Sequence, residues 1–472
     1  MNIVYISPEC FPFAKATSLA DIVSKLSKSV EKEGHNVKLL IPRYGSVDPL
    51  IYQIERIPAD FKVTVNGNTV LASVYKGVIP DSLVSVFFIE SQNYFSNSKE
   101  IYLSSNLDEE RFRFFSFASL TVMSQLTFQA DIIHLFNHHT IDIANIIRSR
   151  GFEGRDFFKD NRIVFTLNNV SGLKENSIKK NILGGINNSD FITVPSKTFM
   201  EDLLNETQKY GLSEALSLKK DCFKGILLPL DDAYNPEGDK SIAQSYSSSY
   251  FSIGKKKCKD ELFELLNLES SSQMPVFCSV SRFSHDNGTD ILIEALHEIS
   301  NMNVNFIVVG KGEPKYEQEL TKIGGKYKNI KVCIGYDYEF SKKVFSGCDF
   351  FVSPERECLN GANILCAMNY GCIPVTYNTG TVKEIILNVN ANAKDGNGII
   401  FNSLDKDSLI EAINNSVKLY KNKEKWPSIV KSAMNFNSSL KDSVSEYIKC
   451  YEKVLSSTAS VPTAALPANL YQ

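Results

Sequence analysis

The chain has 472 residues, of which 43% are hydrophobic and 22% are charged, and its formal net charge is -3. A chain of this length exceeds one hydrophobic core, so we expect two domains of about 200 residues each. The slightly negative charge excludes a basic face for nonspecific binding, so we expect no nucleic-acid partner. No apolar run approaches the ~18 residues of a membrane helix, so we expect no membrane association.

The ten cysteines are scattered without a CxxC pair, and several, such as Cys278 and Cys366, stand inside apolar runs. This distribution is typical of reduced, buried thiols in a reducing compartment. The first residues, Met-Asn-Ile-Val-Tyr-Ile-Ser, lack the basic region of a signal peptide and predict a strand. We therefore expect a cytoplasmic protein.

The first half of the chain alternates short apolar strands with helices. Residues 2–41 predict a strand, a helix and a second strand, which together form one βαβ unit. The same alternation continues with a long helix over 109–128 and strands over 131–135, 163–166 and 191–194. Repeated units of this kind predict a largely parallel sheet.

Residues 224–252 are dense in turn residues and lose apolar periodicity, which indicates a connection between domains. A second α/β series follows, with strands predicted over 276–280, 305–310, 331–335, 350–352 and 373–376. We therefore predict an α/β fold with two Rossmann-like domains. Ligands of such sheets bind outside the carboxyl ends of the strands, and two such domains favour a cleft between facing sheet ends.

Two cationic side chains follow strands directly. Lys15 lies in the loop before the first helix, where it can meet an anion or can remain a solvated lysine. Arg282 follows the strand over 276–280 and can grip a phosphate bidentately, although arginines at helix starts are also common on surfaces. The strand, polar loop and helix within residues 346–386 predict a further place for a phosphate-bearing ligand.

Two neighbouring histidines, His138 and His139, follow the strand over 131–135. We expect the side chains of adjacent residues to point to different sides, which disfavours a shared metal site, and no other cysteine and histidine cluster supplies ligands. For this segment, a histidine that hydrogen-bonds a ligand and a structural histidine both stay open.

Taken together, these loops resemble the bacterial glycogen and starch synthases, in order, over about residues 1–452. The opening loop and helix start, from Glu9 through Asp21, keep most of the pattern E-x-x-P-F-A-K-T-G-G-L-A-D. Residues 134–140 are similar to H-x-x-D-W-H-T, and residues 166–169 match T-I-H-N in part.

The resemblance implies a GT-B architecture, in which two Rossmann-like domains face a central cleft. It implies an acceptor-side domain over 1–235, a nucleotide-sugar donor domain over 236–438 and a helix over 439–456 that crosses back to the first domain. Residues 457–472 have the composition of a disordered tail.

The resemblance also implies ten site residues in three groups. The implied catalytic residues are His139 and Glu357. The implied donor or phosphate-binding residues are Lys15, Arg282, Asn287, Thr379 and Gly380. The implied sugar or acceptor-side residues are Asp21, Asn137 and Asn168. No metal is implied, because the family grips the phosphates with arginine and lysine.

The chain departs from the family pattern at several of these places. Thr17 and Ser18 replace the two glycines of T-G-G, and their Cβ atoms obstruct the close approach of a diphosphate. Asn287 stands where the family has a phosphate-binding lysine. The essential family glutamate falls on Cys358, with Glu357 one place early. Loss of one preorganised electrostatic group typically costs on the order of 10²- to 10³-fold in rate.

Three functional hypotheses stay open. The first is a glucosyltransferase that transfers glucose from ADP-glucose or UDP-glucose to the end of an α-1,4-glucan with retention. The second is a catalytically impaired or inactive homologue that binds glucan or nucleotide, or that regulates a true synthase. The third is a transferase with a shifted donor or acceptor. The expected partners are a nucleotide sugar and an α-glucan, with no other cofactor; a homo-oligomer and association with a true synthase stay open.

Overall fold

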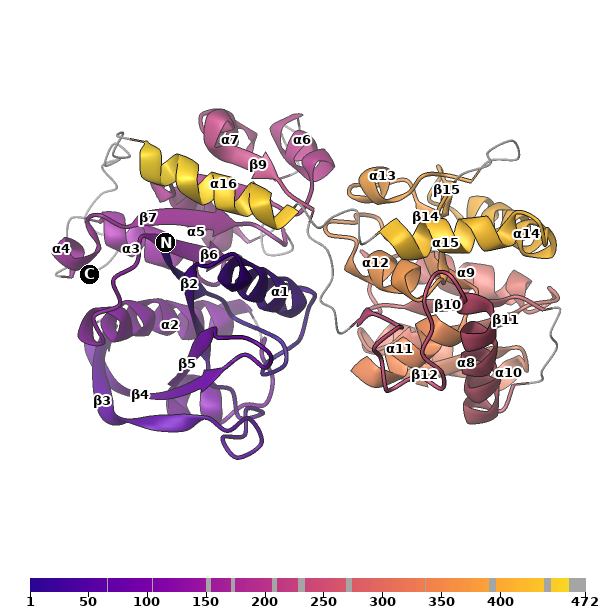
Figure 1. The fold of residues 1–472 in the computed structure, drawn as a ribbon, viewed down its shortest axis with the longest axis horizontal. Coiled ribbons are helices and arrows are strands. Elements are labelled where there is room, and N and C mark those ends of the chain that lie inside the picture. The colour runs from indigo at the N-terminus through magenta and orange to yellow at the C-terminus, as the bar shows by residue number, and fades with distance from the viewer. Residues whose placement is uncertain are drawn as a thin grey trace. The chain divides into compact units, whose positions relative to one another are not determined.

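The protein is described from a computed structural model that covers all residues except 66, 104, 150–153, 171–174, 206–209, 228–233, 269–273, 336, 390–395, 437–442 and 458–472. The chain divides into two compact units (Figure 1). Unit 1 comprises Met1–Leu228 and Asp442–Gln472, and unit 2 comprises Pro229–Lys441. Apart from Ser457, the predicted tail lies outside the described residues. No helix in the described part of the chain is long and apolar enough to span a membrane.

Unit 1 is built on a nine-stranded sheet in the order β3-β4-β5-β2-β1-β6-β7-β8-β9. The strands from β5 to β9 in that order run parallel, and β3 and β4 form an antiparallel hairpin at one edge. The central strands are buried on both faces, which explains their continuous apolar runs. The strands are β1 (Asn2–Ile6), β2 (Asn36–Pro42), β3 (Glu55–Val65), β4 (Asn68–Val78), β5 (Ser85–Glu90), β6 (Ile132–Phe136), β7 (Arg162–Thr166), β8 (Phe191–Val194) and β9 (Phe223–Gly225).

The helices of unit 1 join these strands in the alternation that the sequence predicts. They are α1 (Leu19–Lys32), α2 (Ser105–Gln125), α3 (Asp142–Arg148), α4 (Arg155–Phe158), α5 (Asn176–Asn188), α6 (Lys197–Asn205) and α7 (Ser213–Ser217). Short turns of other helix types stand at η1 (Gln92–Ser96) and η3 (Lys220–Cys222). The C-terminal helix α16 (Ser443–Ser456) also belongs to this unit.

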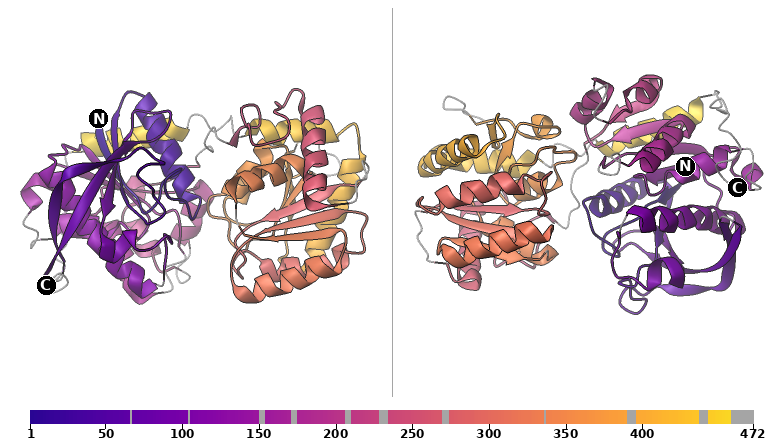
Figure 2. Two further views of the ribbon diagram at one scale, coloured as in Figure 1. Left: turned by 90° about the horizontal axis from the view of Figure 1, so that it is seen from below. Right: turned by 180° about the vertical axis from the view of Figure 1, so that it is seen from behind.

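Unit 2 contains a six-stranded, wholly parallel sheet in the order β12-β11-β10-β13-β14-β15, which lies between two layers of helices (Figure 2). The strands are β10 (Val276–Val280), β11 (Asn305–Gly310), β12 (Ile330–Ile334), β13 (Phe350–Ser353), β14 (Ile373–Tyr377) and β15 (Ile399–Phe401). The helices are α8 (Phe251–Leu266), α9 (Thr289–Ile299), α10 (Pro314–Lys326), α11 (Tyr338–Gly347), α12 (Ala362–Asn369), α13 (Val382–Ile385), α14 (Lys406–Lys421) and α15 (Trp426–Phe436).

The sequence prediction missed helix α8, whose buried face includes a lysine. Nζ of Lys255 is buried and donates to the carbonyl oxygens of Cys348 and Tyr370, both at 2.8 Å, and of Ser346 at 3.1 Å. These carbonyls stand at the ends of α11 and α12, so Lys255 satisfies groups that helix termini leave unpaired. A charged residue on the buried face weakens the apolar periodicity on which the prediction depends.

Helix α16 is joined to the unit 1 sheet by a buried hydrogen-bond network. The Tyr451 hydroxyl lies 2.9 Å from the Tyr5 hydroxyl on β1 and 2.8 Å from Nδ1 of His134 on β6. Nε2 of His134 lies 2.6 Å from the hydroxyl of Thr166 on β7. His134 therefore lies in the middle of its strand, with both ring nitrogens occupied, and has a structural role.

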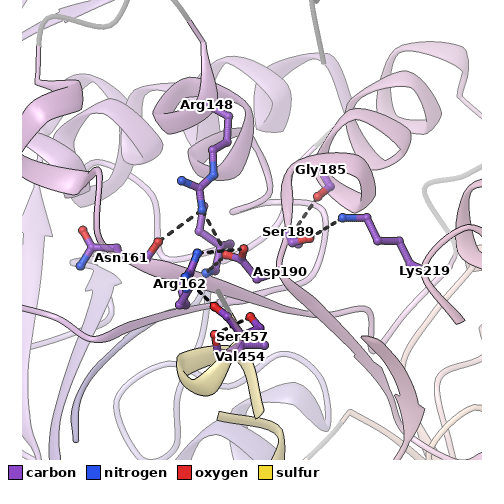
Figure 3. Close-up of polar contacts among 10 residues, drawn as sticks. Arg148, Asn161, Arg162, Gly185, Ser189, Asp190, Lys219, Val454 and Ser457 are labelled. Carbon is purple, nitrogen blue, oxygen red and sulfur yellow. Dashed lines mark hydrogen bonds and ion pairs between the residues drawn. The ribbon is translucent and has the colours of Figure 1, made fainter. Parts of the chain in front are cut away.

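A second polar cluster ties the amino ends of β7 and β8 to the end of α16 (Figure 3). Asp190, directly before β8, accepts the backbone N–H of Ile163 at 2.7 Å and pairs with Arg148 of α3 at 3.1 Å. Arg162 donates to the carbonyl oxygen of Ser457 at 3.0 Å. The C-terminal segment is therefore fixed to unit 1 at two separate places.

Replacing Tyr451 by Phe removes the hydroxyl that contacts both Tyr5 and His134 and leaves buried polar groups unpaired. We expect the free energy of unfolding to fall by roughly 1–3 kcal/mol. Urea unfolding followed by circular dichroism measures this change. Tyr250→Phe is the control, because this tyrosine is 61% exposed and its replacement should change stability by less than about 0.5 kcal/mol. Equal unfolding midpoints for the two variants would contradict a stabilising role for the network.

Candidate active site

The opening loop of unit 1, between β1 and α1, is organised around the buried carboxylate of Glu9. This carboxylate accepts hydrogen bonds from the backbone N–H groups of Ala16 and Thr17, at 2.7 and 2.9 Å, and from the Tyr102 hydroxyl, at 2.8 Å. Burial raises the pKa of Glu9 above its usual value. In many loops before a helix, backbone N–H groups of this kind bind a phosphate. Here the N–H groups of Ala16 and Thr17 are bound to the side chain of Glu9 in the same loop.

The structure brings together two predicted site residues of this loop, Lys15 and Asp21. Nζ of Lys15 lies 2.9 and 2.7 Å from the two carboxylate oxygens of Asp21, which is buried in the first turn of α1. Nζ of Lys15 also lies 5.6 Å from the centre of the Phe11 ring. Asp21 therefore holds the Lys15 ammonium group in place. An anion that binds at this loop would share Lys15 with Asp21.

The predicted residue His139 lies in the turn between β6 and α3, beside His138. The two rings are 3.8 Å apart at their centres and tilted by 31°, so the expectation that these side chains point to different sides was wrong. The prediction used the alternation of a strand, whereas the chain has left the strand at Phe136. The His139 ring also packs against the rings of Tyr102, at 4.8 Å, and Phe112, at 4.6 Å.

Both histidine rings are held in the neutral form. Burial lowers the pKa of His138 to about 4. Burial is also the main cause that lowers the pKa of His139 well below its usual value, with smaller contributions from its neighbours His138 and Arg111. The Nδ1 atom of each ring is buried without a hydrogen-bond partner among the described residues. A neutral imidazole of this kind can donate or accept one hydrogen bond with a sugar hydroxyl.

The predicted residues Asn137 and Asn168 lie side by side at the carboxyl ends of β6 and β7. The Asn137 backbone N–H donates to the carbonyl oxygen of Thr166 at 2.9 Å, and its side-chain Oδ1 accepts the backbone N–H of Asn168 at 2.8 Å. Asn137 has a φ angle of +60°, a conformation that asparagine tolerates better than most residues. Asn137 therefore fixes the position of Asn168 and of the turn that carries the histidine pair.

Burial lowers the pKa of His134 to about 3, that of His138 to about 4 and that of His139 in the same direction. In the unfolded chain each ring binds a proton near pH 6.5, so below that pH the unfolded state binds more protons than the folded state. We expect the free energy of unfolding to fall from pH 6.5 to 5, by up to about 1.4 kcal/mol per pH unit for each histidine.

Urea unfolding at steps of pH measures this slope. Replacing His138 by Gln should reduce the slope by the share of one histidine and leave the remainder. The raised pKa of Glu9 acts in the opposite direction, because the folded state then binds the extra proton, but only nearer the usual range of a carboxyl group. A stability that stays constant from pH 6.5 to 5 would contradict the neutral, buried state of these rings.

In unit 2 the candidate donor residues lie on loops at the carboxyl edge of the sheet. The loop between β10 and α9 carries Arg282 and Asn287. The Arg282 side chain is exposed and has no hydrogen-bond or ion-pair partner in the described part of the chain. Asn287 is partly buried, and its backbone N–H donates to the hydroxyl of Ser284 at 3.3 Å. Arg282 is therefore available to an anionic ligand.

Gly288 allows this loop to touch the loop that follows β13. Its φ angle is +68°, and a Cβ atom there would lie 1.9 Å from the carbonyl oxygen of Pro354. Arg356 donates its backbone N–H to the carbonyl oxygen of Asp286 at 2.9 Å. Its guanidinium makes two parallel hydrogen bonds with the carboxylate of Asp290, at 2.8 and 2.7 Å. The two loops are thereby held as one surface.

The loop after β14 packs against the same residues. The Thr379 hydroxyl donates to the carbonyl oxygen of Arg356 at 3.1 Å. Gly380 has a φ angle of +47°, and a Cβ atom there would lie 2.2 Å from the carbonyl oxygen of Cys358. The predicted residues Thr379 and Gly380 thus lie against the loop of residues 354–361, which also carries Glu357.

Two acidic residues, Glu355 and Glu357, flank Arg356 in this loop. The Glu355 carboxyl group lies near the side chains of Cys358 and Ser353, and burial raises its pKa. Cys358 itself is buried. Sequence reasoning missed Glu355, because it stands three positions before Cys358 and only the turn of the loop brings the two side chains together.

Replacing Gly288 by Ala should destabilise unit 2, because alanine is strained at a positive φ angle and its Cβ atom would overlap the Pro354 carbonyl. We expect a loss of more than about 1 kcal/mol in the free energy of unfolding. Gly325→Ala in helix α10 is the matched control, since a Cβ atom there meets nothing within 4 Å. That control should be neutral or stabilising by up to about 1 kcal/mol. Urea unfolding compares the two; equal stability would show that the loops do not require this approach.

Two family models match the chain. The model described as starch synthase catalytic domain matches residues 2–218, and the model described as glycosyl transferases group 1 matches residues 266–432. Among curated relatives, the glycogen synthase of Fervidobacterium nodosum is 28% identical, with 97% of this chain and 99% of the relative covered. The glycogen synthase of Clostridium botulinum is also 28% identical, with 96% and 99% covered.

Solved structures are similar as well. The catalytic domain of starch synthase IV from Arabidopsis thaliana, bound to ADP and acarbose, has a TM-score of 0.87 at 23% identity and covers 96% of this chain and 99% of that one. Sucrose-phosphate synthase from Thermosynechococcus elongatus has a TM-score of 0.64 at 13% identity, with 96% and 98% covered.

These likenesses confirm the predicted fold class: the protein has the GT-B fold of glycosyltransferases, with two Rossmann-like domains. Together with the family models and the curated relatives, they identify the chain further. It belongs to the glycogen and starch synthase family.

Proposed function

We propose that the protein is a glucosyltransferase that transfers glucose from a nucleoside diphosphate sugar, ADP-glucose or UDP-glucose, to the end of an α-1,4-glucan with retention. The observation that carries this proposal is the match to relatives named glycogen synthase over nearly the whole of both chains. The similar starch synthase IV domain was solved with ADP and acarbose, which favours ADP-glucose as the first donor to test.

The carboxyl edge of the unit 2 sheet is the proposed donor side. Arg282 would bind the diphosphate bidentately, which a guanidinium does better than an ammonium group. Asn287 would add uncharged hydrogen bonds, and the loop of Thr379 and Gly380 would bring backbone donors close to the phosphates. Glu355 and Glu357 are the two carboxyl groups of the adjoining loop that could face the glucose.

Unit 1 supplies the proposed sugar and acceptor-side residues. His139 is neutral and keeps a buried Nδ1 atom without a partner among the described residues, so it suits a hydrogen bond to a sugar hydroxyl. Asn137 and Asn168 hold the adjoining turn in place. The Lys15–Asp21 ion pair offers one positively and one negatively charged group. The proposed chemistry requires no metal from these residues.

A second candidate function is a glucan- or nucleotide-binding homologue with little transfer activity. It is favoured by Cys358 and Asn287, which stand where the family resemblance places a glutamate and a lysine. Each missing electrostatic group typically costs on the order of 10²- to 10³-fold in rate, so two losses without replacement would leave a binding protein.

Incubation with radiolabelled ADP-glucose or UDP-glucose and glycogen distinguishes the two candidates. The proposed function predicts label in the polymer, released again by an enzyme that cleaves only α-1,4 linkages. Absence of label with both donors, while calorimetry detects ADP or maltooligosaccharide, would support the binding protein. Absence of both label and binding would contradict both candidates.

Arg282→Ala should weaken ADP binding by about tenfold or more, because a charge-assisted hydrogen bond typically contributes about 1.5–3 kcal/mol. Isothermal titration calorimetry measures the dissociation constant. Lys322→Ala, which removes an exposed cation on helix α10, is the control and should leave ADP binding unchanged. Equal weakening in the two variants would point to a general effect of charge and would exclude Arg282 as a specific phosphate ligand.

A further inference from the structure

We propose that Tyr102 is a positioning residue of unit 1, which holds the His139 ring and the opening loop of Lys15 in one fixed arrangement. The effect of Tyr102 on glucose transfer rests on the proposed glucosyltransferase function and deepens it. Tyr102 would act through residues that contact the sugar and not on the sugar itself. Its contacts with the two loops can be tested without any transfer activity.

The hydroxyl group of Tyr102 is bound to the buried carboxylate of Glu9. It donates to Oε1 of Glu9 at 2.8 Å, and the Thr17 hydroxyl donates to the same oxygen. The backbone N–H groups of Ala16 and Thr17 donate to Oε2 of Glu9 at 2.7 and 2.9 Å. Ala16 and Thr17 directly follow Lys15 in the chain. The Glu9 carboxylate therefore joins Tyr102 to the loop that carries this cation.

The ring of Tyr102 packs against the ring of His139. The two ring centres lie 4.8 Å apart, and the rings are tilted by 33°. Phe112 of α2 packs against the His139 ring at 4.6 Å and against the Tyr102 ring at 6.3 Å. The His138 ring lies 3.8 Å from that of His139. His139 thus lies in an aromatic cluster, which Tyr102 joins to the opening loop.

The backbone on both sides of Tyr102 is fixed by the first two turns of α2. The carbonyl oxygen of Ile101 accepts a hydrogen bond from Nη1 of Arg111 at 3.4 Å. The backbone N–H of Leu103 donates to Oδ2 of Asp108 at 2.9 Å. Arg111 and Asp108 also form an ion pair with each other at 2.7 Å, and Arg111 is buried. Tyr102 is therefore held at its backbone, at its ring and at its hydroxyl group.

Three segments that are distant in the sequence meet at this one side chain. They are the loop between β1 and α1, the loop before α2 and the turn after β6. Groups that contact a reacting sugar must keep their positions within about 0.5 Å, and supporting residues whose own positions are fixed provide that order. Tyr102 has the position and the contacts of such a supporting residue.

Two substitutions separate the contacts of Tyr102. Tyr102→Phe keeps the ring against His139 and removes the hydroxyl group that binds Glu9, whereas Tyr102→Leu removes both contacts. Tyr327→Leu is the matched control, because this tyrosine also contacts a histidine. Its ring lies 6.0 Å from that of His297 and its hydroxyl 3.2 Å from Nδ1 of His297, in unit 2 and away from the candidate residues.

Nuclear magnetic resonance of the histidine rings tests the contact with His139, whose signal a His139→Gln variant assigns. Burial and the neighbours His138 and Arg111 lower the pKa of His139 well below its usual value, so its signal should stay constant from about pH 8 to about pH 6. Tyr102→Leu should admit water to the ring, raise this pKa toward its usual value and make the signal move with pH. Tyr102→Phe and Tyr327→Leu should leave the signal constant.

Hydrogen exchange tests the contact with Glu9. The backbone N–H groups of Ala16 and Thr17 donate to this carboxylate, and they should exchange faster in Tyr102→Phe than in the natural protein. The reason is that Glu9 loses one of the donors that fix it in the loop. The ring signal of His134, from the middle of β6, shows in each variant that unit 1 is folded.

The glycogen-labelling assay measures the effect on transfer. Tyr102→Leu should lower kcat by about tenfold or more, because a small displacement of a group at the site can cost up to about 10²-fold in rate. Tyr102→Phe should have a rate between those of Tyr102→Leu and the natural protein. Tyr327→Leu should transfer glucose at the natural rate.

Two results would overturn the inference. The first is a His139 signal in Tyr102→Leu that stays constant over this pH range, as in the natural protein. The second is unchanged exchange of the Ala16 and Thr17 N–H groups in Tyr102→Phe, which can be measured even if Tyr102→Leu does not fold. An active protein whose kcat is unaffected by Tyr102→Leu would contradict the role in transfer. A natural protein without transfer activity would contradict the proposed function, whereas the resonance and exchange results would still decide whether Tyr102 holds the two loops.

Discussion

The close approach of three backbone loops at the carboxyl edge of the unit 2 sheet is the constraint on which the candidate donor site depends. Gly288 lies against the carbonyl oxygen of Pro354, and Gly380 lies against that of Cys358. Both contacts are so close that a Cβ atom at either glycine would overlap the carbonyl oxygen. The ion pair between Arg356 and Asp290 then joins the loops through side chains. Because this frame is fixed by backbone contacts, the side chains on it can change without altering the fold.

In unit 1, buried polar groups fix the positions of the loops at the candidate site. Glu9 holds its loop through backbone N–H groups, and Asn137 fixes the turn that carries the histidine pair. Burial keeps His139 neutral, which suits hydrogen bonding better than charge stabilisation. In both units, therefore, rigid loops surround a few side chains whose protonation is shifted by desolvation, and such groups are expected where ligands bind.

Much of the fold follows from the sequence, because apolar strands and amphipathic helices of parallel sheets have strong patterns. Helix α8 escaped that reasoning, since the buried Lys255 interrupts its apolar face while it caps two other helices. The site was harder to predict from the sequence. The stacking of His138 on His139 and the proximity of Glu355 to Cys358 depend on turns, and residue spacing does not predict turn geometry. Motif position pointed to Glu357, and the same loop carries a second carboxyl group in Glu355.

The central claim is that the carboxyl edge of unit 2 binds the donor nucleotide of a glucosyltransferase. A crystal structure of the protein with bound ADP tests it most directly, because the diphosphate would be located without reference to activity. We expect the diphosphate against the Arg282 guanidinium and the loop of Thr379 and Gly380. ADP bound away from these loops, or a crystal without ADP at saturating concentration, would contradict it.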